Sequence, residues 1–248
     1  MKQETKKVIN FIETKNVSLK GFTLIEGFPD LGLAGTIGAR YFVEKLKFEE
    51  IGFIDSKFIL PITRISNGVP VHPIRIYVSK KNKLVVLISE QIIDNKSGYF
   101  MAKELTEWIV KKGIKRVITT SGVKMPEGKN VYAFASDDKA KKIIKENKIE
   151  LINDGVTSGV TALLMLYLKD NHIESICILG NARNNADYDS AIEVVKVISS
   201  ITKTKIDVAP LVEQAKKMQA ILASQLKEID KGQGKETKID SVSTPMYT

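Results

Sequence analysis

The feature that most constrains the fold is a regular alternation of short apolar runs with longer amphipathic stretches. Residues 84–88, Leu-Val-Val-Leu-Ile, form a continuous apolar run, which is the pattern of a strand covered on both faces. Because helical stretches separate most of these runs, the sequence predicts an α/β domain with a largely parallel central sheet. The other predicted strands are residues 22–25, 51–54, 116–120, 131–135, 150–152 and 175–179.

Capping residues mark the ends of several predicted helices. Ser97 can cap one helix and Gly113 can end it. Ser190 and Glu193 have the spacing of a capping box, which predicts the start of another helix. The predicted helices within the domain are residues 33–46, 98–112, 137–147, 158–168 and 190–200.

An inserted hairpin is predicted around the dipeptide Asn67-Gly68, which favours a tight turn. Apolar and polar residues alternate on either side of it, at residues 61–65 and 74–78. With this insertion included, we expect one folded domain from residue 5 to residue 205.

A further helix is predicted after the domain, from Pro210 to about residue 229. Its apolar side chains recur every three or four residues, so they form one stripe that packs either on the parent domain or on copies of itself. Because a polar segment follows, we expect residues 206–229 to drive self-association. The stripe consists of Leu211, Ala215, Met218, Leu222, Leu226 and Ile229.

The last segment, residues 230–248, is predicted to be a flexible tether that ends in a docking tail. Residues 230–245 are polar, contain two glycines and lack apolar periodicity. Met246, Tyr247 and Thr248 then give a hydrophobic residue, a penultimate tyrosine and a carboxylate. This ending resembles the tail by which proteasome activators and assembly chaperones dock into the outer ring of the core particle. Chance alone produces such an ending about once in eighty sequences of this composition.

Charge and apolar content argue against a nucleic-acid or membrane partner. The net charge is +9, but the 33 lysines are scattered and only 5 arginines are present, whereas nucleic-acid surfaces cluster both with aromatic side chains. The densest apolar stretch, residues 162–168, is too short to span a bilayer, and no signal peptide is recognised. Cys177 is the only cysteine and lies in an apolar strand pattern, so we expect it to be buried and the protein to be cytoplasmic.

Motifs for catalysis are missing from the sequence. His72 and His172 have no metal-ligand spacing, and neither a phosphate loop nor a G-x-S-x-G elbow occurs. We therefore expect no enzyme activity, no metal and no cofactor. Two segments remain as ligand candidates: the glycine loop at residues 27–38, for which helix packing is the favoured interpretation, and the polar loop at residues 180–189, for which a helix cap is favoured.

The loop from Gly27 to Gly35, Gly-Phe-Pro-Asp-Leu-Gly-Leu-Ala-Gly, and residues 154–164, Asp-Gly-Val-Thr-Ser-Gly-Val-Thr-Ala-Leu-Leu, together resemble the archaeal proteasome assembly chaperone family. These are homologues of the eukaryotic proteasome assembly chaperone 2 type, and the resemblance covers residues 20–230. It implies a single three-layer α/β domain similar to nucleoside phosphorylases, followed by a C-terminal helix and a flexible tail. The residues of the family loop are Gly27, Phe28, Pro29, Asp30, Gly32 and Gly35.

The resemblance also implies a partner, the α subunits of the 20S proteasome core particle, and a homo-oligomer that is a tetramer or a pentamer. Tyr247 would supply ring packing and a hydrogen bond, Met246 would fill an apolar site, and the Thr248 carboxylate would pair with a lysine. The protein would act as an ATP-independent activator, an adaptor or an assembly factor. The alternative is a metabolic enzyme, phosphorylase-like or ligase-like, that uses the loop at residues 27–38.

Overall fold

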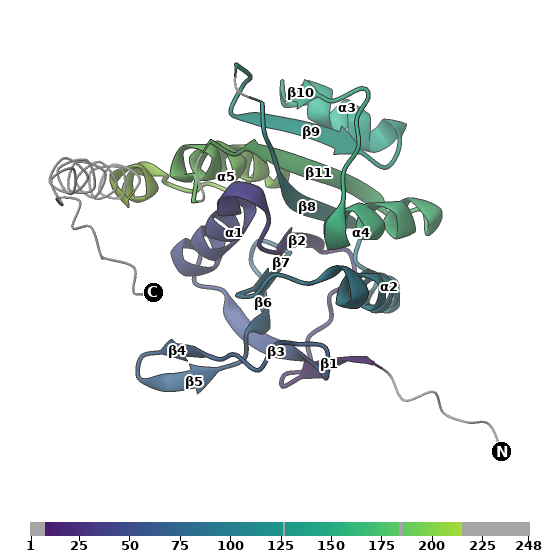
Figure 1. Cartoon of the computed structure of the whole chain (residues 1–248), viewed down its shortest axis with the longest axis vertical. Coiled ribbons are helices and arrows are strands. Elements are labelled where there is room, and N and C mark those ends of the chain that lie inside the picture. Colours follow the sequence, from purple (N-terminus) through teal and green to yellow (C-terminus); the bar gives the residue numbers. More distant parts are fainter. Residues whose placement is uncertain (1–7, 126, 184–185, 215–248) are drawn as a thin grey trace, which may run out of the picture.

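A mixed nine-stranded sheet forms the centre of the computed structural model, which describes residues 8–125, 127–183 and 186–214 (Figure 1). Helices cover both of its faces. In spatial order the strands are β1 (Ile9–Glu13), β3 (Glu49–Ser56), β6 (Ile74–Ser79), β7 (Leu84–Ser89), β2 (Thr23–Gly27), β8 (Arg116–Val123), β11 (Glu174–Asn181), β9 (Val131–Ala135) and β10 (Glu150–Leu151).

The helices divide into two layers. One face of the sheet carries α1 (Ala34–Lys45), α3 (Asp138–Glu146) and α5 (Tyr188–Thr202), and the other carries α2 (Asn95–Lys112) and α4 (Gly159–Asp170). Strand β7 contributes to both cores, because Val86 packs with the first layer and Leu87 with the second. Burying each such side chain stabilises the fold by roughly 1.5–3 kcal/mol. The prediction of a strand covered on both faces at residues 84–88 is therefore confirmed, as is the α/β class.

The prediction of a largely parallel sheet holds only for its middle. Strands β7, β2, β8 and β11 are parallel to one another, whereas β1, β3 and β6 pair antiparallel and β9 runs antiparallel to β11. The reason is connectivity: β6 and β7 are joined by residues 80–83 alone, which is too short for a parallel crossover. Strand β1, at the edge of the sheet, was not predicted.

The hairpin is centred as predicted but its second strand is different. Asn67 and Gly68 both have positive φ, 50° and 79°, as the tight turn requires. The turn joins β4 (Arg64–Ser66) to β5 (Val69–Val71), and this hairpin projects from the main sheet (Figure 1). Residues 74–78 lie instead in β6, which is buried along its whole length between β3 and β7. Burying this apolar strand between β3 and β7 stabilises the fold more than pairing it across the Asn67-Gly68 turn would.

Two predicted helix caps are wrong by three residues. Asp94 caps α2 by accepting a hydrogen bond from the Ser97 N–H at 2.8 Å, and Asp187 caps α5 by accepting one from the Ser190 N–H at 2.8 Å. Both serines lie inside the first turn, where an aspartate ahead of them already satisfies the free N–H groups. Gly113 ends α2 with φ 65°, as predicted.

Candidate functional site

The glycine loop leaves β2 and is fixed to the end of β8 by Asp30. One carboxylate oxygen of Asp30 accepts a hydrogen bond from the Leu31 N–H at 2.7 Å, and the other accepts one from the Ser121 hydroxyl. The loop then makes the 3₁₀ turn η1 (Leu31–Leu33), in which Gly32 has φ 75°. A side chain at Gly32 would be strained at that angle. Hydrogen bonds of Asp30 thus connect the loop to β8 just before α1 begins.

The glycines of the segment allow α1 to approach the sheet. A Cβ atom at Gly35 would lie 2.0 Å from the Thr120 Oγ1 atom, and one at Gly27 would lie 2.4 Å from the Ala39 Cβ atom. Such distances leave no room for any side chain. The geometry favours the packing interpretation of the loop over an open cradle for a nucleotide.

Glu26, at the end of β2, is a buried carboxyl group that the sequence analysis missed. It accepts a hydrogen bond from the Phe28 N–H at 2.7 Å and lies 3.4 Å from the Thr120 nitrogen and 3.5 Å from the Thr161 hydroxyl. Burial, with a smaller contribution from the charge of Asp30, raises the pKa of Glu26 to about 8. The group therefore holds its proton at neutral pH. A glutamate within the apolar run Leu-Ile-Glu-Gly was the available signal.

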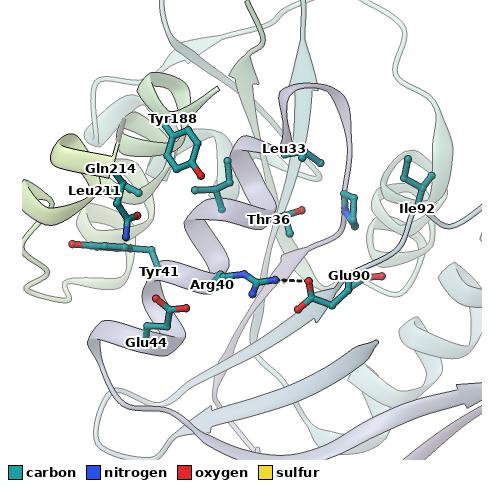
Figure 2. A pocket seen from close by; sticks show the side chains of 13 residues that line it. Leu33, Thr36, Arg40, Tyr41, Glu44, Glu90, Ile92, Tyr188, Leu211 and Gln214 are labelled. Atoms are coloured by element: carbon teal, nitrogen blue, oxygen red, sulfur yellow. Dashed lines mark hydrogen bonds and ion pairs between the residues drawn. The ribbon is translucent and has the colours of Figure 1, made fainter. Parts of the chain in front are cut away.

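A groove of about 500 Å³ lies beside α1, between the segment after β7 and residues 209–214 (Figure 2). Thr36, Arg40 and Glu44 face it from successive turns of α1, because residues four apart share one side of a helix. The remaining lining is mainly apolar and comes from Pro29, Leu33, Ile37, Tyr41, Ile92, Tyr188 and Leu211, with Ser89, Glu90 and Gln214 as further polar residues.

Three arginines converge on one carboxylate at the rim of this groove. Glu90 accepts hydrogen bonds from Arg40, from Arg64 at 2.8 Å and from Arg75 at 2.7 Å. Arg75 also lies 3.9 Å from Glu50. The arginines belong to α1, β4 and β6, so the cluster joins the hairpin, the sheet and the groove. Its members are far apart in the sequence, so no sequence motif predicted the cluster.

The polar loop at residues 180–189 serves the fold in the part that the structure describes. Asn181 is buried and donates hydrogen bonds to the carbonyl oxygens of Met125 at 2.7 Å and Lys129 at 2.9 Å. Asp187 is buried as the cap of α5. These contacts favour the helix-cap interpretation over a substrate loop.

The structure also places Cys177 and His72, two further residues considered in the sequence. Cys177 is fully buried, and burial raises the pKa of its thiol. His72 stacks on Phe53, with ring centroids 3.5 Å apart. Within residues 8–125, 127–183 and 186–214, no three His, Cys, Asp or Glu side chains are grouped to hold a metal ion, and no helix is long and apolar enough to cross a membrane.

The docking tail, Met246, Tyr247 and Thr248, lies outside the described residues. Most of the apolar stripe does too, namely Ala215, Met218, Leu222, Leu226 and Ile229. Leu211 is described, and it is 1% exposed because it packs into the core beside Tyr41 and α5. At this first position the stripe packs on its own domain, which was the alternative to self-association.

Comparison with known proteins gives a family and a fold. A model of the PAC2 family matches residues 24–226. An uncharacterized protein of Methanocaldococcus jannaschii is 25% identical over 244 residues, which cover 96% of this chain and 98% of that protein. Pyrococcus furiosus PbaA, an archaeal homolog of proteasome-assembly chaperone, has a similar structure, with a TM-score of 0.81 and 23% identity over 92% of this chain and 96% of that one. Pyrococcus furiosus PbaB, an archaeal proteasome activator, also has a similar structure, with a TM-score of 0.76 and 20% identity over 88% of this chain and 98% of that one.

Proposed function

The chain belongs to the PAC2 family, as the glycine loop and residues 154–164 together predicted, and from this premise we propose that it is a proteasome assembly chaperone-like protein. In this proposal it binds the α ring of the 20S core particle through Met246, Tyr247 and Thr248. It acts without ATP as an activator, an adaptor or an assembly factor.

The observation that carries the proposal is the join between the domain and the C-terminal segment. The domain has the fold of PbaA and PbaB, and its last described residues, 209–214, are helical, with Leu211 and Gln214 lining the groove. A further 34 residues follow and finish with the docking triplet. A short peptide with an aromatic ring and a carboxylate suits capture in a closed pocket, and several tails on one oligomer would bind jointly.

The tail is tested by surface plasmon resonance with purified core particle. We expect Tyr247→Ala, or removal of residues 246–248, to abolish binding, because the ring and the carboxylate supply most of the contact. Thr244→Ala, three residues earlier in the predicted tether, is the matched control and should bind like the unaltered chain. Undiminished binding by the truncated chain would overturn the proposal. Peptide hydrolysis by the core particle without nucleotide then separates an activator from an assembly factor.

Self-association is tested separately with Leu222→Glu. A charge in the stripe forces either burial of an unpaired carboxylate or separation of the helices, and separation is the less unfavourable outcome. We expect light scattering to show smaller species and the core particle to bind more weakly, since avidity falls with the number of tails. An unchanged mass would mean that the stripe packs on its own domain along its whole length, as Leu211 does.

A further inference from the structure

The groove beside α1 contains hydrogen-bonding capacity that the described residues do not use. The Thr36 hydroxyl is buried and has no hydrogen-bond partner among them, although Thr36 lines the groove (Figure 2). Arg40, one turn further along, contacts Glu90 through its Nη2 atom and must share that carboxylate with two other arginines. A guanidinium has five N–H donors, so Arg40 can bind a second anionic group.

The charge around Glu90 also favours an anion. Three guanidinium groups lie within 4.0 Å of the two carboxylates of Glu90 and Glu50 in the described part of the chain, which leaves one positive charge in excess. Glu44 lies at the opposite end of the α1 row and disfavours an anion there. The position that suits a carboxylate is therefore between Thr36 and Arg40, with the apolar side chains of Leu33 and Ile37 beside it.

We propose that this groove binds the chain's own C-terminal tail, residues 246–248, and thereby withholds it from the core particle. The inference rests on the proposed function, in which Thr248 carries the terminal carboxylate. That carboxylate pairs with Arg40 and accepts a hydrogen bond from Thr36, while the Tyr247 ring lies against the apolar wall of the groove. The groove thus offers the tail a cation, a hydroxyl donor and an apolar surface.

The length of the C-terminal segment suits a return to the groove. Gln214, the last described residue, lines the groove itself, so the segment begins at the site. The predicted helix continues for residues 215–229, which is about 22 Å at 1.5 Å per residue. The predicted tether of 16 residues has a root-mean-square reach of roughly 20–24 Å. A tether whose reach matches the span gives the highest effective concentration, on the order of millimolar.

Docking in the groove and docking in the α ring exclude each other, because both use the same carboxylate and ring. The apparent affinity for the core particle is then reduced by the fraction of tails that are free. A variant that empties the groove should bind the core particle more tightly than the unaltered chain.

Digestion with carboxypeptidase Y tests tail protection on the full-length chain without the core particle. Release of Thr248 is followed by mass spectrometry, with the free peptide of residues 230–248 as the unprotected reference. We expect release from the unaltered chain to be at least ten times slower than from the peptide. Arg40→Gln and the nearly isosteric Thr36→Val should each restore the peptide's rate.

Arg64→Gln is the matched control, because Arg64 pairs with the same Glu90 carboxylate but does not line the groove. It should leave the tail protected. Circular dichroism checks that each variant is folded. Tenfold dilution should leave protection unchanged, as expected for docking within one chain. Release from the unaltered chain at the peptide's rate, equal acceleration by Arg64→Gln, or loss of protection on dilution would each overturn the inference.

Binding to the core particle separates this inference from the proposed function. We expect Arg40→Gln to tighten binding by about the factor by which it accelerates Thr248 release. If the tail is protected but no variant binds the core particle, the proposed function fails and the groove still binds the tail. If the core particle binds the unaltered chain and Arg40→Gln equally and the tail is unprotected, the inference fails and the proposed function stands.

Discussion

Helix α1 has two faces that differ in side-chain size, packing and polarity. Toward the sheet and α5 it presents Gly35, Gly38 and Ala39, and the approach is so close that a Cβ atom at Gly35 would overlap Thr120. Toward the groove it presents Thr36, whose hydroxyl has no partner among the described residues, and Arg40, which shares the Glu90 carboxylate with two other arginines. The packed face and the groove face are interleaved in one short sequence.

The comparison shows that the conspicuous residues of a motif need not be the ones that line a groove. The glycines resemble a ligand loop in the sequence, yet they serve close packing, which is a requirement of the fold. The residues between them, which look ordinary in the sequence, line the groove. Three experiments on stability can sharpen or break this contrast.

The largest expected effect concerns Glu26, whose carboxyl group lies against Thr120 behind the packed face. Below pH 4.5 the folded and unfolded chains both hold this proton; between pH 4.5 and 8 the unfolded chain releases it and the folded chain does not. Stability should therefore fall as pH rises through that window, by up to roughly 5 kcal/mol. Glu26→Gln should remove this dependence in urea titrations from pH 5 to pH 8.

Glu150→Gln is the control for that experiment, because the Glu150 side chain is about half exposed and pairs with Lys129 at the surface. It should keep the slope of the unaltered chain. An identical slope in Glu26→Gln would mean that Glu26 is ionised in the folded chain.

The next effect is steric. Gly35→Ala places a methyl group 2.0 Å from the Thr120 Oγ1 atom and should destabilise the chain by about 2–3 kcal/mol. Gly98→Ala, also within a helix, is the matched control, because the nearest atoms to its new methyl group are 3.8 Å away. It should be neutral or stabilise by about 0.5–1 kcal/mol. Equal melting temperatures for the two variants would contradict the description of a closed, packed face.

The smallest effect lies on the groove face. Thr36→Val removes a buried hydroxyl without a partner among the described residues, so in a chain that lacks residues 246–248 the free energy of unfolding should stay constant or rise by less than about 1 kcal/mol. Thr106→Val is the matched change, since the Thr106 hydroxyl donates to the Ala102 carbonyl oxygen at 2.8 Å. It should lose about 1 kcal/mol. A loss at Thr36 as large as that at Thr106, measured without residues 246–248, would show that the hydroxyl already has a partner within the domain.

The parts of the fold that depend on local physics could be predicted from the sequence. The apolar run at residues 84–88 predicts a buried strand from its composition alone. Gly113 predicts a helix end, because glycine readily adopts the positive φ that is needed there. Residues 74–78 were wrongly predicted as the second strand of the hairpin, because the pairing of β6 with β3 and β7 depends on burial in three dimensions and not on the local pattern. The antiparallel pairing of β1, β3 and β6, at one side of the nine-stranded sheet, was not predicted for the same reason.

The candidate site could be predicted less well. The tail is a local pattern that the sequence alone predicts, and it stays a prediction because it lies outside the described residues. The groove depends on Glu90 meeting three arginines from remote segments, and on residues 209–214 closing one side, which no spacing rule expresses. Glu26 was overlooked because a carboxyl group in an apolar strand is unusual unless burial keeps it protonated.

Glu90 is an ionic cross-link between segments that are far apart in the chain. Arg64 connects the projecting hairpin to this carboxylate, Arg75 connects β6 to it, and Arg40 connects α1 to it. Replacing Glu90 by a neutral residue would therefore remove an ionic contact from all three elements at once and leave their guanidinium groups without the carboxylate that they share.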